Sequence, residues 1–159
     1  IPMWGRSGWN RWWGGYSASL PPPPLPLAGQ TVLVVEDYDI NRMIMANQLR
    51  ENGAQVREAG DGDTAVAMAA EPGIDLILMD IQMPGKDGIA AIQDIRQWPT
   101  GGRLPILGFT ASADRPTHQR ILAAGADRVL TKPISETDLV RAVRRALRRG
   151  RPASSTQGD

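Results

Sequence analysis

This sequence lacks several of the residues on which common kinds of protein site depend. Among its 159 residues there is no cysteine and only one histidine. The absence of cysteine excludes a disulfide scaffold, a thiolate metal site and a cysteine nucleophile. A single histidine excludes a metal centre built on several imidazoles. A metal site in this chain would therefore depend on oxygen ligands.

Charge is nearly balanced over the whole chain but not along it. The 18 basic and 17 acidic side chains leave a formal charge of +1, which argues against a protein dedicated to binding polyanions. Residues 1–28 carry a charge of +2, residues 29–134 a charge of −4 and residues 135–159 a charge of +3. The arginines of the last segment suit the C-terminal end of a helix, and no nucleic-acid recognition fold follows them. We therefore expect no nucleic-acid partner; an acidic partner helix would fit the same charges.

Aromatic residues are scarce, and most of them lie near the first residue. Five of the eight aromatic side chains fall within residues 1–16, and six of the 13 prolines precede residue 27. The stretch 4–15 has neither a helical nor a strand period, and the proline run 21–26 favours an extended polyproline II spacer. We predict that residues 1–28 are a disordered lead, with a partner-docking motif as the alternative.

No part of this lead is long and apolar enough to span a membrane or to act as a secretion signal. We therefore expect no membrane contact from this segment and, together with the absence of cysteine, a cytoplasmic location. Because the chain starts at Ile1 rather than Met, we expect it to be a processed product or a piece of something longer.

From residue 31 onward, short apolar runs alternate with segments of helical period. The predicted strands are residues 31–35, 54–58, 75–79, 105–109 and 128–131. The clearest helix shows apolar residues on one face over 139–147, after a polar start at 135–138. Alternating strands and helices favour an α/β fold with a parallel sheet. About 120 residues are available, and a closed eight-fold barrel needs about 250, so an open sheet fits better. We predict a five-stranded, doubly wound parallel sheet with helices on both faces within residues 29–149, followed by a disordered tail at 150–159.

Charged and polar side chains directly follow four of these strands. They are Glu36 and Asp37 after the first strand, Asp80 after the third, Thr110 after the fourth and Lys132 after the fifth. In a doubly wound sheet, ligands bind at the carboxyl ends of the strands, so we expect these side chains to converge. Three clustered carboxylates need a cation, and oxygen ligands favour Mg²⁺. The sequence therefore predicts a magnesium site at this edge of the sheet.

Phosphoryl transfer is the chemistry that this combination favours. An ammonium group adds little to a site that only holds a metal, but a metal and a lysine can share the charge of phosphoryl oxygens. Asp80 stands alone at its strand end and is the best candidate for a nucleophile that forms an aspartyl phosphate, with a hydrogen bond from Thr110 to the phosphoryl group. Each residue taken alone is more often a loop residue, a helix cap or a solvated side chain. Their occurrence in order at four strand ends favours the functional interpretation.

These strand ends resemble the receiver domain of two-component response regulators. The resemblance covers residues 31–147 and rests on four motifs. They are Val35-Glu36-Asp37, Met79-Asp80-Ile81-Gln82-Met83-Pro84-Gly85-Lys86-Asp87-Gly88, Phe109-Thr110-Ala111 and Thr131-Lys132-Pro133-Ile134. The resemblance implies the flavodoxin-like strand order 2-1-3-4-5.

The resemblance also implies roles for the acidic residues. Asp80 would take a phosphoryl group from the phosphohistidine of a histidine kinase or a histidine phosphotransfer protein. The domain itself would catalyse this transfer and the later hydrolysis. Mg²⁺ would be bound by Asp37, Asp80 and the backbone carbonyl of Gln82, while Glu36 would contact the ion mainly through water.

Further expectations from the resemblance concern the active state. Thr110 and Lys132 would bind the phosphoryl oxygens, and the peptide bond between Lys132 and Pro133 would be cis. Three residues before the lysine, many family members have Tyr or Phe, whose rotation follows phosphorylation, whereas this chain has Val129. Thr110 and Val129 are thus the expected switch positions. We expect the surface of the fourth helix, fifth strand and fifth helix to signal differently, or to matter less.

Residues 36–42 further resemble the receivers that are fused to hybrid histidine kinases. We therefore predict a phosphorelay receiver at the C-terminal end of such a kinase, which would make the full-length protein a histidine kinase. A stand-alone single-domain response regulator is the first alternative. A phosphorylation-independent protein-interaction module of the same fold is the second, and a small-molecule enzyme built on the same sheet is the third.

Overall fold

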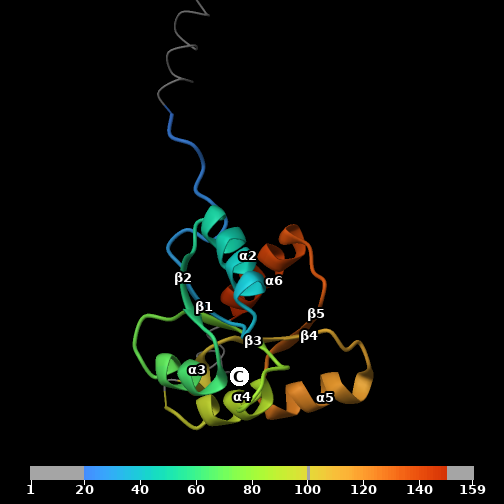
Figure 1. Ribbon diagram of the computed structural model, residues 1–159. Helices are drawn as coiled ribbons and strands as arrows, with labels where there is room; N and C mark the ends of the chain where they lie inside the picture. The colour runs from blue at the N-terminus through green and yellow to red at the C-terminus, as the bar shows by residue number, and fades with distance from the viewer. Residues whose placement is uncertain (1–19, 100, 150–159) are drawn as a thin grey trace, which may run out of the picture.

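A computed structural model describes residues 20–99 and 101–149, which form a parallel sheet covered by helices (Figure 1). The strands are β1 (Thr31–Val35), β2 (Gln55–Ala59), β3 (Leu76–Asp80), β4 (Ile106–Thr110) and β5 (Arg128–Thr131). The helices are α2 (Asp39–Glu51), α3 (Gly62–Ala69), α4 (Gly88–Arg96), α5 (Arg115–Ala124) and α6 (Glu136–Arg149), with a short 3-10 turn η2 (Gly101–Arg103). Neighbouring strands are parallel and follow the order β2-β1-β3-β4-β5. The predicted fold class and strand order are confirmed.

Helices lie on both faces of the sheet, and each face has its own apolar core. In Figure 1, α2 and α6 lie above the sheet, whereas α3, α4 and α5 lie below it. Successive residues of a strand point to opposite faces, so Leu33 packs with the lower helices and Val34 with the upper ones. Every residue of β3 and β4 is buried, which explains why these strands read as continuous apolar runs.

The strands occur where the sequence predicts them, but three are shifted by one residue. β2, β3 and β4 each begin and end one residue later than predicted. Asp80 and Thr110 remain in the ladder, paired with Phe109 and Thr131, because a polar side chain does not interrupt main-chain pairing. Pro105, by contrast, has no N–H to donate and precedes β4.

The last helix, α6, begins at the polar stretch that predicts it. The main-chain N–H of Asp138 donates to the Ser135 hydroxyl at 3.1 Å, and that of Leu139 donates to the Ser135 carbonyl at 2.9 Å. Ser135 therefore caps the helix. Leu139 and Val143 are fully buried, so the predicted apolar face is the one that covers the sheet.

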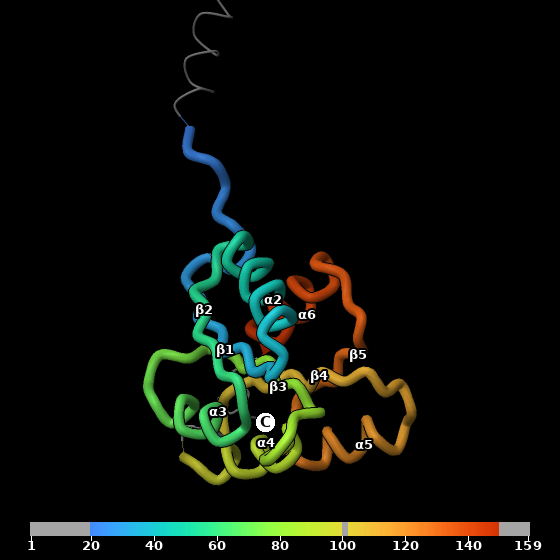
Figure 2. Tube along the Cα trace, in the orientation of Figure 1, coloured from blue at the N-terminus to red at the C-terminus, as the bar shows by residue number. Residues whose placement is uncertain are grey.

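The packed part of the chain includes Leu27, which lies within the predicted lead of residues 1–28. Leu27 is fully buried in the core cluster beneath α2 and α6, and its main-chain N–H donates to the carbonyl of Asn52 at 2.8 Å. Composition does not reveal that this one leucine of a proline-rich stretch packs into the core. Residues 20–25 are exposed and lead away from the domain (Figure 2). The predictions of disorder for residues 1–19 and 150–159 lie outside the described residues.

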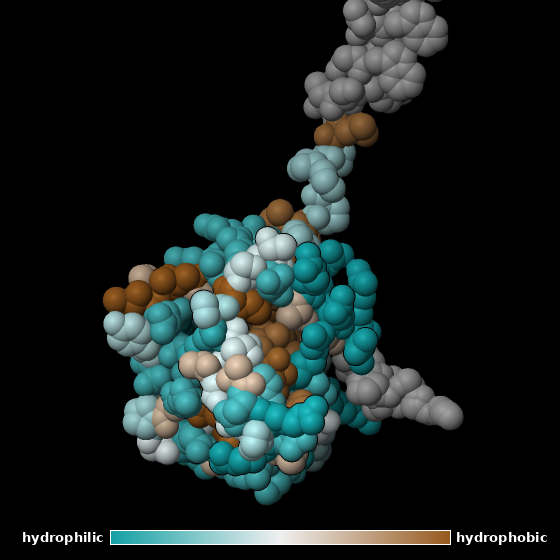
Figure 3. All heavy atoms as spheres, turned by 90° about the vertical axis from the view of Figure 1, so that its right-hand side faces the viewer, coloured by the Kyte–Doolittle hydropathy of each residue, from teal (hydrophilic) through white to brown (hydrophobic). Residues whose placement is uncertain are grey.

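One side of the surface is mostly polar (Figure 3). None of the described helices is long and apolar enough to cross a membrane. Figure 3 shows the side of the molecule that carries α5 and β5, which is largely hydrophilic, with apolar atoms near its middle and at its left rim.

Candidate functional site

The carboxyl ends of the strands bring the predicted side chains to one edge of the sheet. Glu36 directly follows β1, and Asp80 ends β3, the strand beside it. Thr110 ends β4, and Lys132 follows β5. Parallel strands end at the same edge, so the structure joins residues as far apart in sequence as Glu36 and Lys132, which are separated by 96 positions.

The acidic residues form a tight cluster with unequal exposure. Carboxylate oxygens of Glu36, Asp37 and Asp80 lie within 4.8 Å of one another. Glu36 and Asp80 are each only 2% exposed, whereas Asp37 is exposed. Buried carboxylates that face one another repel unless a cation lies between them. The three carboxylates therefore need a compensating positive charge nearby.

Lys132 supplies part of that charge. Its Nζ lies 3.2 Å from Glu36 Oε1 and 3.2 Å from Asp80 Oδ1. Burial alone would lower the pKa of Lys132, but the negative charges of Asp80 and Glu36 outweigh burial and raise that pKa above its ordinary value. Burial, and then the hydrogen bond and charge of Asp80, raise the pKa of Glu36 above that of a free glutamate. One ammonium group thus bridges two buried acids and leaves the cluster short of positive charge.

The backbone of the acidic loop is held by a residue that the sequence reasoning missed, Arg42 of α2. Its Nη1 donates to the carbonyl oxygen of Glu36 at 2.7 Å, and its Nη2 donates to Asp39 at 2.7 Å. Its Nε donates to Glu58 of β2 at 3.2 Å. The spacing from Asp39 to Arg42 on one helical turn was a signal for the second contact. The contacts with Glu36 and Glu58 depend on the packing of α2 against the sheet and leave no local signal.

The loop after β3 is fixed by a close approach of α4. The main-chain N–H of Gln82 donates to Asp80 Oδ1 at 3.3 Å, and that of Gly88 donates to the Ile81 carbonyl at 3.0 Å. A Cβ atom on Gly88 would lie 2.3 Å from the Asp80 carbonyl oxygen, so a side chain has no room there. Asp87 accepts from Ala90 N–H at 2.9 Å and caps the helix. The loop that carries Gln82 therefore has a defined path beside Asp80.

Thr110 and Lys132 are linked through the backbone. The main-chain N–H of Lys132 donates to the Thr110 carbonyl at 2.8 Å, and the Thr110 hydroxyl accepts from Ser112 N–H at 3.0 Å. The peptide bond between Lys132 and Pro133 is cis, as the resemblance implies. Val129 is half-buried and packs against the core beneath the sheet.

A hollow opens beside these side chains. It has a volume of about 540 Å³ and lies between the loops that follow β3 and β4. Gln82, Met83, Thr110 and Ser112 contribute to its lining. A group bound at the edge of the sheet would therefore have open space on the side of α4 and α5.

The donor set fits a hard divalent cation. Three carboxylates face one ammonium group, so a divalent ion would offset the remaining negative charge, and oxygen ligands are those that Mg²⁺ prefers. The histidine of the chain, His118, lies outside the acid cluster and has its Nε2 atom 2.8 Å from the Ser112 carbonyl oxygen. Glu36, Asp37 and Asp80 each offer one carboxylate oxygen to such an ion.

Comparison with protein families and curated proteins identifies one family. The family model that describes the response regulator receiver domain matches residues 32–144. The sensor histidine kinase RcsC of Salmonella typhimurium is 41% identical over 104 residues, which cover 65% of this chain and 11% of RcsC. The transcriptional regulatory protein PdtaR of Mycobacterium tuberculosis is 40% identical over 129 residues, which cover 80% of this chain and 62% of PdtaR. The chain thus spans only part of the length of these relatives.

Solved structures agree with this match. The receiver domain of the sensor histidine kinase PA1611 from Pseudomonas aeruginosa superposes with a TM-score of 0.71 at 37% identity, covering 76% of this chain and 98% of that one. That receiver has a magnesium ion coordinated in its active site cleft.

Proposed function

This chain belongs to the response regulator receiver family of two-component signalling, and from that premise we propose that it accepts a phosphoryl group on Asp80 from a phosphohistidine donor. One observation carries the proposal. Asp80, a carboxylate only 2% exposed, lies 3.2 Å from the ammonium group of Lys132 and belongs to a cluster of three acids at the carboxyl edge of the sheet. A carboxylate held beside positive charge in this way is suited to attack phosphorus.

In the proposed transfer, a carboxylate oxygen of Asp80 forms a bond to phosphorus as the bond from phosphorus to the donor imidazole breaks. The imidazole nitrogen keeps the electron pair of that bond. The Lys132 ammonium group and the Thr110 hydroxyl would then share the charge of the phosphoryl oxygens. The Thr110 hydroxyl accepts a hydrogen bond from Ser112 N–H. Its own proton would be donated to a phosphoryl oxygen, with or without loss of the bond from Ser112.

Glu36, Asp37, Asp80 and the carbonyl oxygen of Gln82 would hold Mg²⁺. When bound, the ion would supply positive charge that neutralises the acids and the phosphoryl oxygens. The support for this proposal is the all-oxygen donor set and the shortage of positive charge within the cluster. The contacts of Arg42 would hold the Glu36 backbone while Asp37, the exposed acid, completes the site.

We further propose that the donor is a histidine kinase or a histidine phosphotransfer protein, and that the chain is a receiver of a hybrid histidine kinase in the cytoplasm. The similarity to RcsC supports this context. A stand-alone response regulator is the second candidate, and the similarity to PdtaR, at 40% identity over 129 residues, favours it.

The phosphoacceptor role can be tested with a small phosphodonor. We expect the protein, incubated with phosphoramidate and Mg²⁺, to gain the mass of one phosphoryl group, and we expect Asp80→Asn to abolish the gain. Asp63→Asn is the matched control, because Asp63 is an aspartate whose side chain is 82% exposed outside the cluster. A folded wild-type protein of unchanged mass would overturn the proposal and favour a phosphorylation-independent interaction module.

A further inference from the structure

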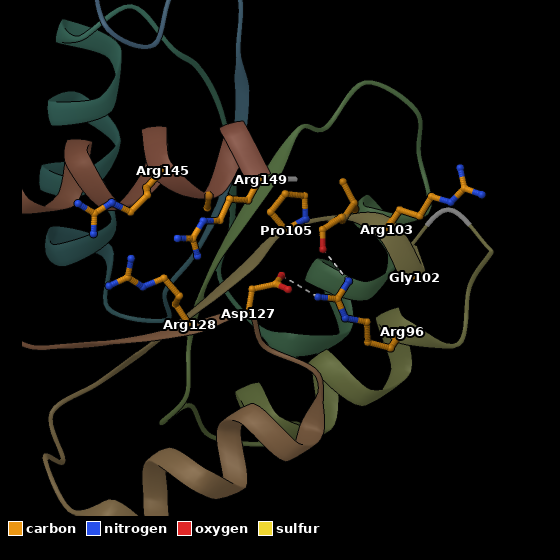
Figure 4. A pocket seen from close by; sticks show the side chains of 10 residues that line it. Arg96, Gly102, Arg103, Pro105, Asp127, Arg128, Arg145 and Arg149 are labelled. Atoms are coloured by element: carbon orange, nitrogen blue, oxygen red, sulfur yellow. Dashed lines mark hydrogen bonds and ion pairs between the residues drawn. The ribbon is translucent and has the colours of Figure 1, made fainter. Parts of the chain in front are cut away.

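A second cluster of charged side chains lies at the opposite edge of the sheet, where β4 and β5 begin. It surrounds a cleft of about 190 Å³ between the end of α4, η2 and the end of α6 (Figure 4). The charged residues of the lining are Arg96, Arg103, Asp127, Arg128, Arg145 and Arg149. Five arginines thus share one cleft with a single carboxylate.

That carboxylate, Asp127, already accepts hydrogen bonds from other parts of the domain. Asp127 Oδ2 accepts from Arg96 Nη2 at 3.0 Å and from the main-chain N–H of Ile106 at 2.8 Å. Arg96 also donates to the carbonyl oxygens of Gly125 and Leu104, at 2.9 and 2.6 Å. Arg96 and Asp127 therefore tie α4 to the start of β4 and β5. They offer little charge to balance the other arginines.

Three of the remaining arginines face the same space. In Figure 4 the side chains of Arg128, Arg145 and Arg149 extend into the space to the left of Asp127, while Arg103 points away to the right. Within residues 20–99 and 101–149, none of these three makes an ion pair or a side-chain hydrogen bond. Guanidinium groups that converge without a counter-charge repel one another, and an anion among them would remove that repulsion.

The helix macrodipole does not account for this arrangement. It favours cations anywhere around the last turn of α6, and Arg148 satisfies it as well as Arg149 does. It gives no reason for Arg128, at the start of β5, to face the same cleft. Arg145 and Arg149 are four residues apart and so lie on one face of the helix. The helix macrodipole therefore does not explain why Arg128, Arg145 and Arg149 line the same cleft.

We propose that this cleft binds a compact anion that carries at least two phosphate groups, of the size of pyrophosphate. Guanidinium groups bind phosphate oxygens in a bidentate manner, and three of them match more than one such group. The lining contains no aromatic side chain on which a base could stack, its apolar part being Leu104, Pro105 and Ala146. The volume is also below the roughly 300 Å³ at which pockets for drug-sized ligands begin. A small inorganic anion therefore fits better than a nucleotide.

Calorimetric titration of the protein with pyrophosphate tests the proposal, at constant ionic strength and without divalent metal. We expect saturable binding with one site. We expect the double variant Arg145→Gln with Arg149→Gln to weaken it at least about tenfold, since two charge-assisted contacts are lost. The double variant Arg144→Gln with Arg148→Gln is the control: it makes the same charge change on the same helix but outside the cleft. Arg128→Gln, on a different element, should weaken binding in the same way as the first variant.

Four outcomes would overturn the proposal. They are the absence of saturable binding, equal losses in the two α6 variants, unchanged affinity in Arg128→Gln, and equal competition by sulfate, which would indicate an adventitious ion only. Asp80→Asn should bind pyrophosphate as the wild type does, because Asp80 lies at the other edge of the sheet. Failure of the phosphoacceptor proposal would therefore leave this one standing, and the reverse also holds.

Discussion

Lys132 shows how one residue can decide the state of a buried acidic cluster. It bridges Glu36 and Asp80, both nearly inaccessible, through two contacts of 3.2 Å. Removal of the ammonium group would leave these two carboxylates facing each other with no compensating charge. A buried pair that loses one partner is destabilised far more than an exposed pair.

We expect Lys132→Met to lower the free energy of unfolding by about 1–2 kcal/mol in the absence of Mg²⁺, measured by urea denaturation. This is less than the loss of about 3–5 kcal/mol for a fully buried pair, because the lysine side chain is 27% exposed. The loss should shrink when Mg²⁺ is added, since the ion would supply the missing charge.

Lys86→Met is the matched control for that measurement. Lys86 has a similar exposure of 26% and also contacts two acids, but those acids, Asp94 and Asp63, are 42% and 82% exposed. We expect a much smaller change for this variant than for Lys132→Met, because exposed ion pairs contribute little to stability. Equal losses in the two lysine variants would show that burial of the acids is not the deciding factor.

Arg42 leads to a second prediction at the residue scale, which concerns affinity rather than stability. Arg42→Met should weaken Mg²⁺ binding about tenfold, in the range seen when a residue that orients metal ligands is removed, because the Glu36 carbonyl loses its donor at 2.7 Å. Isothermal titration calorimetry with Mg²⁺ measures the change.

Arg50→Met controls for the loss of an α2 arginine. Arg50 also contacts Glu58, at 3.0 Å, but makes no bond to the acidic loop. Its removal should leave Mg²⁺ affinity nearly unchanged. If both arginine variants behaved alike, the contact between Arg42 and the Glu36 carbonyl would have no positioning role.

Sequence alone located the charged residues of the site but not the residue that positions them. Glu36, Asp80 and Lys132 each directly end or follow a strand, so the rule that parallel strands end at one edge is enough to bring them together. Arg42 lies on a helix, and its three partners come from a loop, the first turn of α2 and β2. The helical period links Arg42 only to Asp39, so the packed structure alone reveals the contacts with Glu36 and Glu58.

At the scale of elements, the start of α5 beside Thr110 depends on one capping aspartate. Asp114 accepts from the Ser112 hydroxyl and, at 2.9 Å, from the main-chain N–H of Thr117. The hydrogen bond from Ser112, followed by that from Thr117, lowers the pKa of Asp114 to about 2. The cap therefore holds the end of the loop that follows β4.

The lowered pKa fixes the sign of a pH effect. Because the pKa is about 2 in the folded protein and about 3.9 in an unfolded chain, the cap stabilises the fold above about pH 4. This contribution is lost as the pH falls from about 4 to about 2. Urea midpoints of wild type and Asp114→Ala should therefore differ most near neutral pH and converge in acid. A difference that stayed constant down to about pH 2 would contradict this account.

The elements themselves were largely predictable, and their ends were not. The strands follow from short apolar runs, and the helix from Glu136 to Arg149 follows from the helical period of its buried face. The shift of β3 and β4 by one residue follows from main-chain pairing by Asp80 and Thr110. Hydrophobicity does not report such pairing, since it depends on a neighbouring strand.

At the scale of the whole molecule, the folded unit includes a leucine from a stretch that composition assigns to the lead. Leu27 is fully buried, and large-to-small changes at such sites cost about 2–5 kcal/mol. We expect Leu27→Ala to lower the free energy of unfolding by an amount within that range, measured by urea denaturation.

Leu20→Ala is the control for that change. Its side chain is 66% exposed, so its removal should alter the free energy of unfolding by no more than about 0.5 kcal/mol. Equal effects of the two substitutions would mean that the stretch before residue 29 is not part of the core.

The two charged clusters lie at opposite edges of the sheet, so charge is separated across the molecule. The net charge of +1 does not reveal this separation. The acids lie at the carboxyl edge of the sheet and the arginine cleft at the amino edge. A charged object that approaches such a molecule exerts a torque on it before any contact forms. An anionic surface turns the arginine edge toward itself and leaves the acids facing solvent, while a cationic patch turns the acids toward itself. The charge of a partner would therefore select which edge of the molecule meets it before any contact forms.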